Sequence, residues 1–179
     1  SAEEWSGDGY LVERERSPLL RGRRKYITYN QLVTNTVIVA AGVRYFLNLI
    51  AGAKWTFKPP EGEDGEPLPG AEEVAAFIEN VLLVELESSW AKVIRRAARF
   101  RFQGFSWQEW TACQREDGKI GLKDVEARPC YTIERWDLDE GNTVNGVIQQ
   151  VTGKPDVYLP RAKALYLVDD VLEDRPDGT

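Results

Sequence analysis

The chain has 179 residues, 42% of them hydrophobic and 29% charged, with a net charge of -6, which is typical of a single soluble globular domain. Histidine is absent, so catalytic Ser-His-Asp and Cys-His groups are excluded and the commonest metal ligand is missing. The two cysteines, Cys113 and Cys130, are too few for a disulfide framework or a zinc site, which favours a reducing compartment and half-buried thiols on strands.

Charge is strongly segregated along the chain. Residues 1–58 carry a net charge of +4, and residues 59–90 contain nine acidic side chains and no basic one. Residues 91–101 contain five basic side chains and no acidic one, whereas residues 102–179 carry a net charge of -6. Such blocks favour pairing between unlike surfaces, within one chain or between copies. The acidic total argues against a protein that coats nucleic acid along its whole surface.

The first 28 residues are predicted to form an arm or lead-in, because residues 1–25 show no sustained hydrophobic period. The basic run from Arg21 to Lys25 is interpreted as a solvated tail or a contact segment. Nothing near the N-terminus resembles a signal peptide. Because Ser1 stands first and methionine is absent, we expect a fragment of a longer chain, in which residues 29–179 form one domain.

From about residue 29 to residue 50 the pattern is helical and apolar on nearly every face. Such a helix must be buried all round, so we expect a central core helix or one also covered by a neighbouring subunit. Asn35, Arg44 and Asn48 would each be costly in hydrocarbon, which favours a buried helix over a membrane span. Residues 55–57 follow as a predicted short strand.

The middle of the chain predicts a loop followed by two helices. Residues 59–70 are acidic and rich in proline and glycine, which predicts a mobile loop. Helical spacing of apolar residues then covers residues 71–86 and 89–103. Ser88 or Ser89 can cap the second of these helices, and Gly104 can end it.

After Gly104 the hydrophobic period changes to two, which predicts strands, and Asp117-Gly118 indicates a hairpin turn. Helices followed by strands predict an α+β fold, with the helices packed on an antiparallel sheet or meander over about residues 105–168. The predicted strands cover residues 105–114, 119–126, 131–136, 144–151 and 164–168.

Candidates for catalysis are weak. No glycine run matches a phosphate loop or a dinucleotide-binding turn. Two carboxylate clusters could bind a divalent ion, but their places beside turns favour solvated loop ends, so we expect no enzyme activity, cofactor or metal. These clusters are Asp137, Asp139 and Glu140, and Asp169, Asp170, Glu173 and Asp174.

The basic helix face is the main electrostatic candidate. It can contact DNA phosphates, but pairing with the acidic block at residues 61–87, within the chain or across a subunit boundary, is favoured on charge complementarity. The aromatic residues that follow could stack on bases, although core packing is the default. Candidate inter-subunit or DNA-contact residues are Lys92, Arg95, Arg96, Arg99 and Arg101, with Glu72, Glu73 and Glu79 on the acidic side. The aromatic residues are Phe100, Phe102, Phe105, Trp107 and Trp110.

An ordered series of short motifs resembles the N-terminal part of tailed-phage portal proteins, particularly the Mu-like group. The match covers about residues 29–179, and it departs from the family where Asp177 replaces the usual aromatic residue of the closing turn. The motifs are Tyr29-Asn30-Gln31-Leu32, Ala53 to Phe57, Arg99 to Glu109, Arg128-Pro129, Leu159 to Leu165, and Arg175 to Thr179.

The resemblance implies the outer wing of a structural subunit, which forms a ring with copies of itself, typically a dodecamer. Through this ring double-stranded DNA is packaged and ejected at one vertex of the capsid. Capsid protein, terminase and a head–tail adaptor are the partners implied for the full-length chain. The implied location is the virion, with the host cytoplasm during assembly, and no membrane. Two alternatives are a nucleic-acid-binding module that uses the basic helix at residues 92–101, and a metal-dependent hydrolase.

Overall fold

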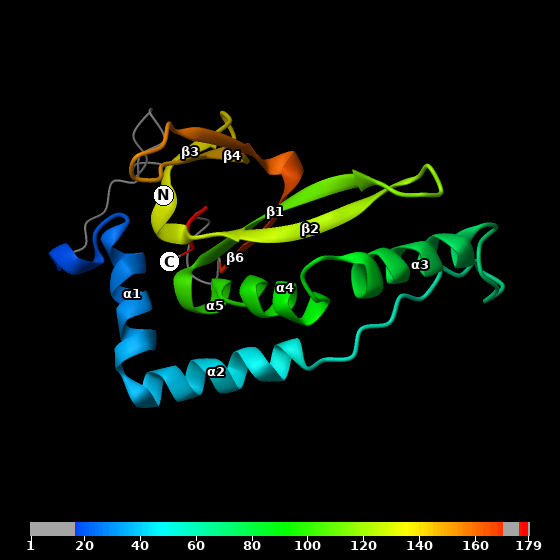
Figure 1. Cartoon of the computed structure of the whole chain (residues 1–179), viewed down its shortest axis with the longest axis horizontal. Helices are drawn as coiled ribbons and strands as arrows, with labels where there is room; N and C mark the ends of the chain where they lie inside the picture. Colours follow the sequence, from blue (N-terminus) through cyan, green and yellow to red (C-terminus); the bar gives the residue numbers. More distant parts are fainter. Residues whose placement is uncertain (1–16, 170–175, 179) are drawn as a thin grey trace.

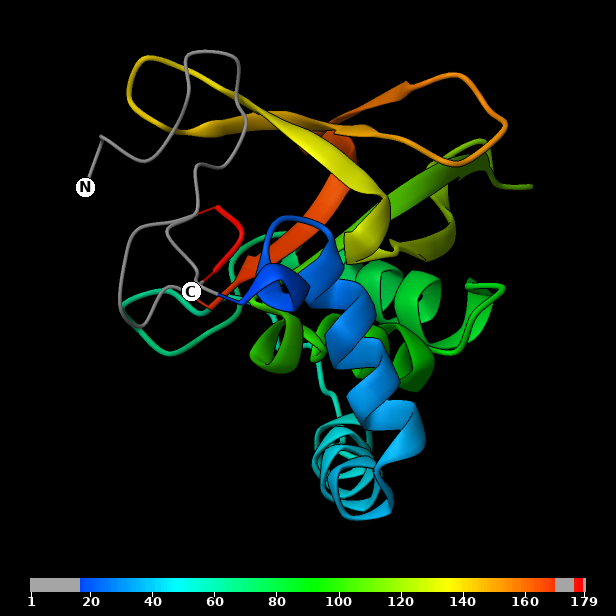
Figure 2. The same cartoon turned by 90° about the vertical axis from the view of Figure 1, so that its left-hand side faces the viewer.

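The computed structural model describes residues 17–169 and 176–178, in which helices and two antiparallel sheets form layers (Figures 1 and 2). Each sheet has three strands, in the orders β2-β1-β6 and β3-β4-β5. The strands are β1 (Phe105–Gln114), β2 (Ile120–Arg128), β3 (Ile133–Leu138), β4 (Val144–Gln149), β5 (Val157–Pro160) and β6 (Ala164–Val168).

The helices cover one side of the first sheet, while the second sheet covers the other. In Figure 1, α4 lies beneath β1 and β2, α2 runs below α4, and α1 stands across one end. The α-helices are α1 (Arg24–Asn35), α2 (Val37–Ala51), α3 (Ala71–Asn80), α4 (Trp90–Ala97) and the short α5 (Phe100–Gln103). Short turns of helix are η2 (Pro18–Leu20), the π-helix η3 (Val81–Glu85), η4 (Cys130–Thr132) and η5 (Arg161–Lys163).

The predicted α+β class is confirmed, and the strands are divided between two sheets. The Asp117-Gly118 hairpin joins β1 and β2 as predicted, with Gly118 at φ 78°. The predicted strand at residues 131–136 begins two residues late, because η4 occupies its start, and β5 was not predicted. Residues 55–57 form no strand, because the chain there runs between helices without a pairing partner among the described residues.

Strand β1 packs on both of its faces. Phe105 and Trp107, each 1% exposed, point toward the second sheet, where the Phe105 ring centroid lies 4.9 Å from that of Trp136. On the opposite face, Trp110 packs on a smaller cluster that includes Val93 of α4. Fully burying one such aromatic side chain contributes about 1.5–3 kcal/mol, so β1 holds the helical layer and the second sheet together.

The predicted helix at residues 29–50 is two helices that meet at a bend of 97°. Thr36 is extended (φ -105°, ψ 104°), and the Thr34 hydroxyl donates a hydrogen bond of 2.7 Å to the Asn30 carbonyl, an alternative to regular helix bonding. The expectation of burial all round is wrong for the single chain, since Val37 is 84% and Ile38 81% exposed. Among the described residues no single helix is long and apolar enough to cross a membrane; α1 and α2 meet those criteria only as a bent pair.

The basic run at residues 21–25 is part of the fold and not a solvated tail. The Lys25 side chain is only 7% exposed, and its Nζ lies 2.5 Å from Asp177 Oδ2. Arg23 forms an ion pair of 2.8 Å with Glu134. The predicted arm therefore ends before these residues, because the C-terminal turn and β3 supply their counter-charges.

The predicted helix at residues 89–103 is confirmed with one interruption. Ser89 caps α4 by accepting a hydrogen bond from the Lys92 N–H, and the turn at Ala98-Arg99 separates α4 from α5. Gly104 ends α5 at φ 88°, as predicted. A Cβ at Gly104 would overlap the Asp177 carbonyl oxygen, so glycine also allows the C-terminal turn to approach.

Removing the Asp177 carboxylate should strongly destabilise the fold. Asp177→Ala removes the carboxylate that lies 2.5 Å from the buried Lys25 ammonium, and we expect a loss of about 3–5 kcal/mol in the free energy of unfolding. Urea denaturation measures this loss. The exposed Glu116→Ala should change stability by less than about 0.5 kcal/mol, and equal losses in the two variants would contradict the prediction.

Two glycines with positive φ provide a matched test of close packing. Gly104→Ala and Gly118→Ala share an unfavourable backbone conformation, but a Cβ at Gly118 meets no atom within 4 Å. We expect Gly118→Ala to lose about 1 kcal/mol and Gly104→Ala at least about 1–3 kcal/mol more, as measured by thermal unfolding. Similar melting temperatures for the two variants would show that the C-terminal turn does not pack against Gly104.

Candidate functional site

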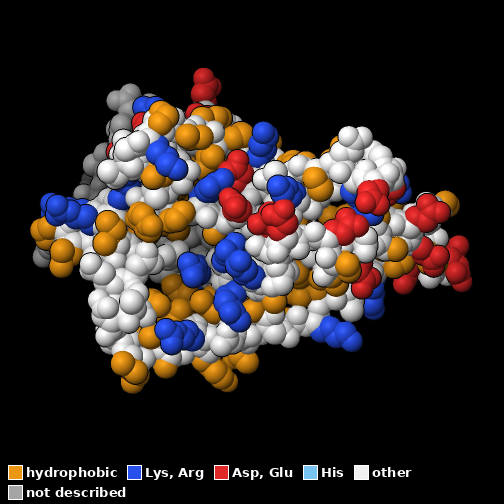
Figure 3. Space-filling view, in the orientation of Figure 1, with side chains coloured by type: hydrophobic (Ala, Val, Ile, Leu, Met, Phe, Trp, Pro, Cys, Tyr) orange, Lys and Arg blue, Asp and Glu red, His pale blue; other side chains and the backbone are white. Residues whose placement is uncertain are grey.

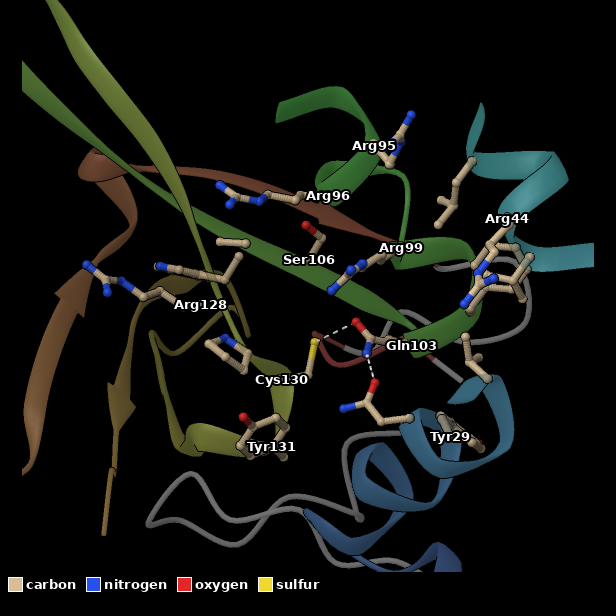
Figure 4. A pocket seen from close by; sticks show the side chains of 18 of the residues that line it. Tyr29, Arg44, Arg95, Arg96, Arg99, Gln103, Ser106, Arg128, Cys130 and Tyr131 are labelled. Carbon is tan, nitrogen blue, oxygen red and sulfur yellow. Dashed lines mark hydrogen bonds between the residues drawn. The ribbon is translucent and has the colours of Figure 1, made fainter. Parts of the chain in front are cut away.

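A cleft of about 1280 Å³ separates α1 and α2 from α4, the C-terminal end of β2, and η4 (Figure 4). The 97° bend between α1 and α2 shapes two of its walls. Apolar side chains of these helices line one side, including Leu32, Val39, Val43 and Leu47. The other side is mixed, with five cations among neutral residues and two carboxylates, Asp124 and Glu126. The cleft therefore joins an apolar wall to a basic one.

Four of the five cations singled out in the sequence line this cleft: Lys92, Arg95, Arg96 and Arg99. Their spacing of three and four residues places them on one face of the helical segment. In Figure 4, Arg96 and Arg99 extend into the cleft and Arg95 points toward its rim. The fifth cation, Arg101, lies elsewhere and forms an ion pair of 2.7 Å with Asp169.

Two further basic residues, Arg44 of α2 and Arg128 of β2, complete the basic lining, and neither was predicted to lie beside the basic helix face. Arg128 is already paired, with its guanidinium 2.5 Å from Glu109. Arg44 is the single charged residue of α2, and this isolated charge was the signal in the sequence that could have marked it. Their places depend on long-range packing, so spacing along the chain could not bring them to the α4 face.

Five of the cleft cations form no ion pair in the described part of the chain, although two carboxylates, Asp124 and Glu126, also line the cleft. Within residues 17–169 and 176–178, no carboxylate lies within 4.0 Å of Arg44, Lys92, Arg95, Arg96 or Arg99. The nearest acidic residues in sequence are engaged by the hairpin instead: Glu85 pairs with Arg115 at 2.8 Å, and Glu87 with Lys123 at 3.6 Å. Pairing of the basic face with the acidic block is therefore not seen within the described chain.

The acidic candidates lie at the other end of the molecule. Glu72, Glu73 and Glu79 are exposed on α3, and the acidic side chains gather at the end that carries α3 and its preceding loop (Figures 1 and 3). Glu72 and Glu73 stand in the first turn of α3, where negative charge stabilises a helix. The structure thus separates the acidic candidates from the basic cleft.

The floor of the cleft is a neutral hydrogen-bonded network. The Cys130 thiol donates to Gln103 Oε1 at 3.4 Å, and Gln103 Nε2 donates to Asn30 Oδ1 at 3.0 Å (Figure 4). Burial raises the pKa of the Cys130 thiol to about 12, against weaker opposing effects of a backbone hydrogen bond, Arg99 and Lys25. A thiol with that pKa stays protonated at neutral pH and is a poor nucleophile.

The aromatic candidates serve mainly in packing. Phe105 and Trp107 are buried, and Phe102 packs edge-on against Phe46 with ring centroids 5.2 Å apart. Phe100 and Trp110 are half-buried. Because the rings contact one another and the core, they offer no continuous platform for stacking bases.

The first acidic cluster organises a turn. Asp139 accepts backbone hydrogen bonds of 2.8 Å from Gly141 and Thr143, chiefly the latter, and these lower the pKa of its carboxyl. Asp137 accepts a bond of 2.7 Å from the Tyr158 hydroxyl, which raises the pKa of Tyr158. The described residues contain no group of three His, Cys, Asp or Glu side chains placed to hold a metal. Asp170, Glu173 and Asp174 lie outside the described residues.

No protein-family model matches this chain, and a search of curated proteins finds no match.

Alkaline pH should destabilise the protein through Cys130. The pKa of its thiol is about 12 in the folded state against 9.0 when unperturbed, so the folded state keeps a proton that the unfolded state loses. The stabilisation is complete below pH 9 and is lost as pH rises toward 12, at up to about 1.4 kcal/mol per pH unit.

Urea denaturation between pH 9 and 11 measures this slope. The free energy of unfolding of Cys130→Ala should fall less steeply with pH than that of the wild type. Other groups titrate in both proteins, so their contributions cancel in the difference between the two slopes. Parallel slopes for the wild type and Cys130→Ala would contradict the prediction.

Proposed function

We propose that this chain is a structural subunit of a phage portal ring, through which DNA is packaged and ejected at one capsid vertex. The ordered motifs between Tyr29 and Thr179 support the family, and the exposed apolar face of α2 is the observation that supports self-assembly. In this proposal the chain has no catalytic role and needs no cofactor. Nucleic-acid binding by the basic helix is a competing function, and the experiment in the next subsection separates it from self-assembly.

The apolar face of α2 needs a partner in the assembled protein. Val37, Ala41, Tyr45 and Leu49 follow at intervals of four residues, which places them along one side of the helix, and Ile38 flanks them. All five are exposed, and α2 lies at the lower margin of the molecule in Figure 3, where hydrophobic atoms reach the surface. Contiguous apolar surface of this kind marks interaction sites. A neighbouring copy that covers it supplies the burial that the composition of the helix requires.

The proposed copy number, partners and location follow from the resemblance to portal proteins. A head-to-tail contact that repeats by rotation closes a ring, and the proposed ring is a dodecamer. Capsid protein, terminase and a head–tail adaptor are the proposed partners of the full-length chain, and DNA passes through the channel. The proposed location is the capsid vertex of the virion, reached by assembly in the host cytoplasm.

A charge on the α2 face should prevent ring assembly. Ile38 is 81% exposed, so Ile38→Glu leaves the fold of the single chain intact while placing a carboxylate in an apolar interface. We expect sedimentation of the full chain to shift from rings to small species, and electron microscopy to show rings for the wild type alone.

Ile120→Glu is the matched control, because Ile120 is 66% exposed at the start of β2, away from α2. This variant should assemble like the wild type. If Ile38→Glu forms rings like the wild type, the α2 face is not part of the interface between copies. A wild-type chain that forms no rings would overturn the proposed function.

A further inference from the structure

We propose that the acidic turn at residues 60–68 of one copy docks in the basic cleft of the next copy. This inference rests on the self-assembly proposed above, and it names the two surfaces that meet. It concerns a different surface from the α2 face, so the two proposals are tested by different variants.

The acidic turn is an ordered, protruding structure. The Leu68 N–H donates to the Pro60 carbonyl at 3.0 Å, and the Gly62 N–H donates to the Glu66 carbonyl at 2.8 Å, so the two arms of the turn are held together. A bridge between Glu61 and Pro67 lies between these bonds. The predicted loop is therefore a hairpin-like turn whose shape is set before any partner arrives, which lowers the entropic cost of docking.

Four carboxylates project from this turn: Glu61, Glu63, Asp64 and Glu66. All four residues are exposed, and in the described part of the chain none has a cation within 4.0 Å. Asp64 is used locally, since its carboxylate accepts the Glu66 N–H at 3.2 Å. The turn thus concentrates negative charge that the described chain does not neutralise.

The cleft matches the turn in charge and in polarity. Its lining holds five cations that form no described ion pair, and they would face the four carboxylates of the turn: Arg44, Lys92, Arg95, Arg96 and Arg99. The two carboxylates of the lining are engaged elsewhere, Asp124 by Ser88 and Glu126 by Arg128, so the excess charge of the cleft is positive. Leu68 at the base of the turn is 48% exposed, and the apolar wall formed by α1 and α2 offers a surface for it. Complementary potentials of this kind direct the encounter and exclude wrong registers.

The two surfaces cannot meet within one copy of the folded chain. The turn lies at the end of the molecule beyond α3, and the cleft lies toward the opposite end, beside α1 (Figures 1 and 3). A contact between unlike surfaces at opposite ends is heterologous, and it repeats from copy to copy, closing a ring where the rotation between copies closes. The acidic and basic segments of the sequence therefore lie at different ends of the folded subunit.

Complementary charge reversal in the full chain tests this contact. One variant carries Arg95→Glu and Arg96→Glu, and the other carries Glu63→Lys and Glu66→Lys with Asp64 retained to preserve the turn. Each variant alone should assemble at least about tenfold more weakly, because like charges meet at every interface. An equimolar mixture should recover assembly, since each reversed turn then meets a reversed cleft and each native turn a native cleft. Sedimentation at moderate salt measures the recovery, and mass spectrometry should show equal numbers of the two variants in the rings.

A matched control reverses two exposed acids outside the turn, Glu140→Lys and Asp156→Lys, and should assemble like the wild type. Weak assembly of both test variants without recovery on mixing would overturn the docking and leave self-assembly intact. Assembly that neither test variant weakens would also overturn the docking. If Arg95→Glu with Arg96→Glu instead reduces salt-dependent retention of double-stranded DNA at unchanged oligomeric mass, the cleft binds nucleic acid and the docking is wrong.

Discussion

The buried face of β1 is the contact on which both layers of this protein depend. Phe105 and Trp107 fill the space between the two sheets, where Trp136 and Tyr166 close around them with ring centroids 4.9–6.4 Å apart. The next residues of the same strand support the helical layer, so β1 belongs to both packing interfaces at once. β1 therefore positions α4 and β2, which carry the basic side of the cleft, relative to the second sheet.

The ends of the described chain are joined to that core by a polar contact. Lys25 of α1 and Asp177 of the last turn form a buried ion pair, and the turn rests on Gly104 just before β1 begins. A buried pair of this kind gives little net stability compared with apolar packing, but breaking it is costly. Here the ion pair fixes the N-terminal end of α1 to the C-terminal turn, and α1 forms one wall of the cleft.

Charge and apolar surface are arranged so that each copy has unlike ends. The cations of α4 face a cleft in which positive charge is in excess, and the carboxylates of the turn before α3 lie at the opposite end of the molecule. The α2 face adds an apolar surface that the single chain leaves exposed. Unlike surfaces on one rigid subunit favour repeated head-to-tail association, which is the architecture proposed for the ring.

The sequence by itself determined the α+β class, the hairpin at Asp117-Gly118, the Ser89 cap, the end of the basic helix at Gly104, and the face that gathers Lys92, Arg95, Arg96 and Arg99. These features depend on local geometry, hydrogen bonding and spacing, which neighbouring residues control. Only the tertiary structure decided the bend at Thr36, the division of the strands into two sheets, the pairing of Lys25 with Asp177, and the arrival of Arg44 and Arg128 at the cleft. Those features depend on contacts between residues far apart in the chain. The free energy of such contacts cannot be deduced from a local pattern in the sequence.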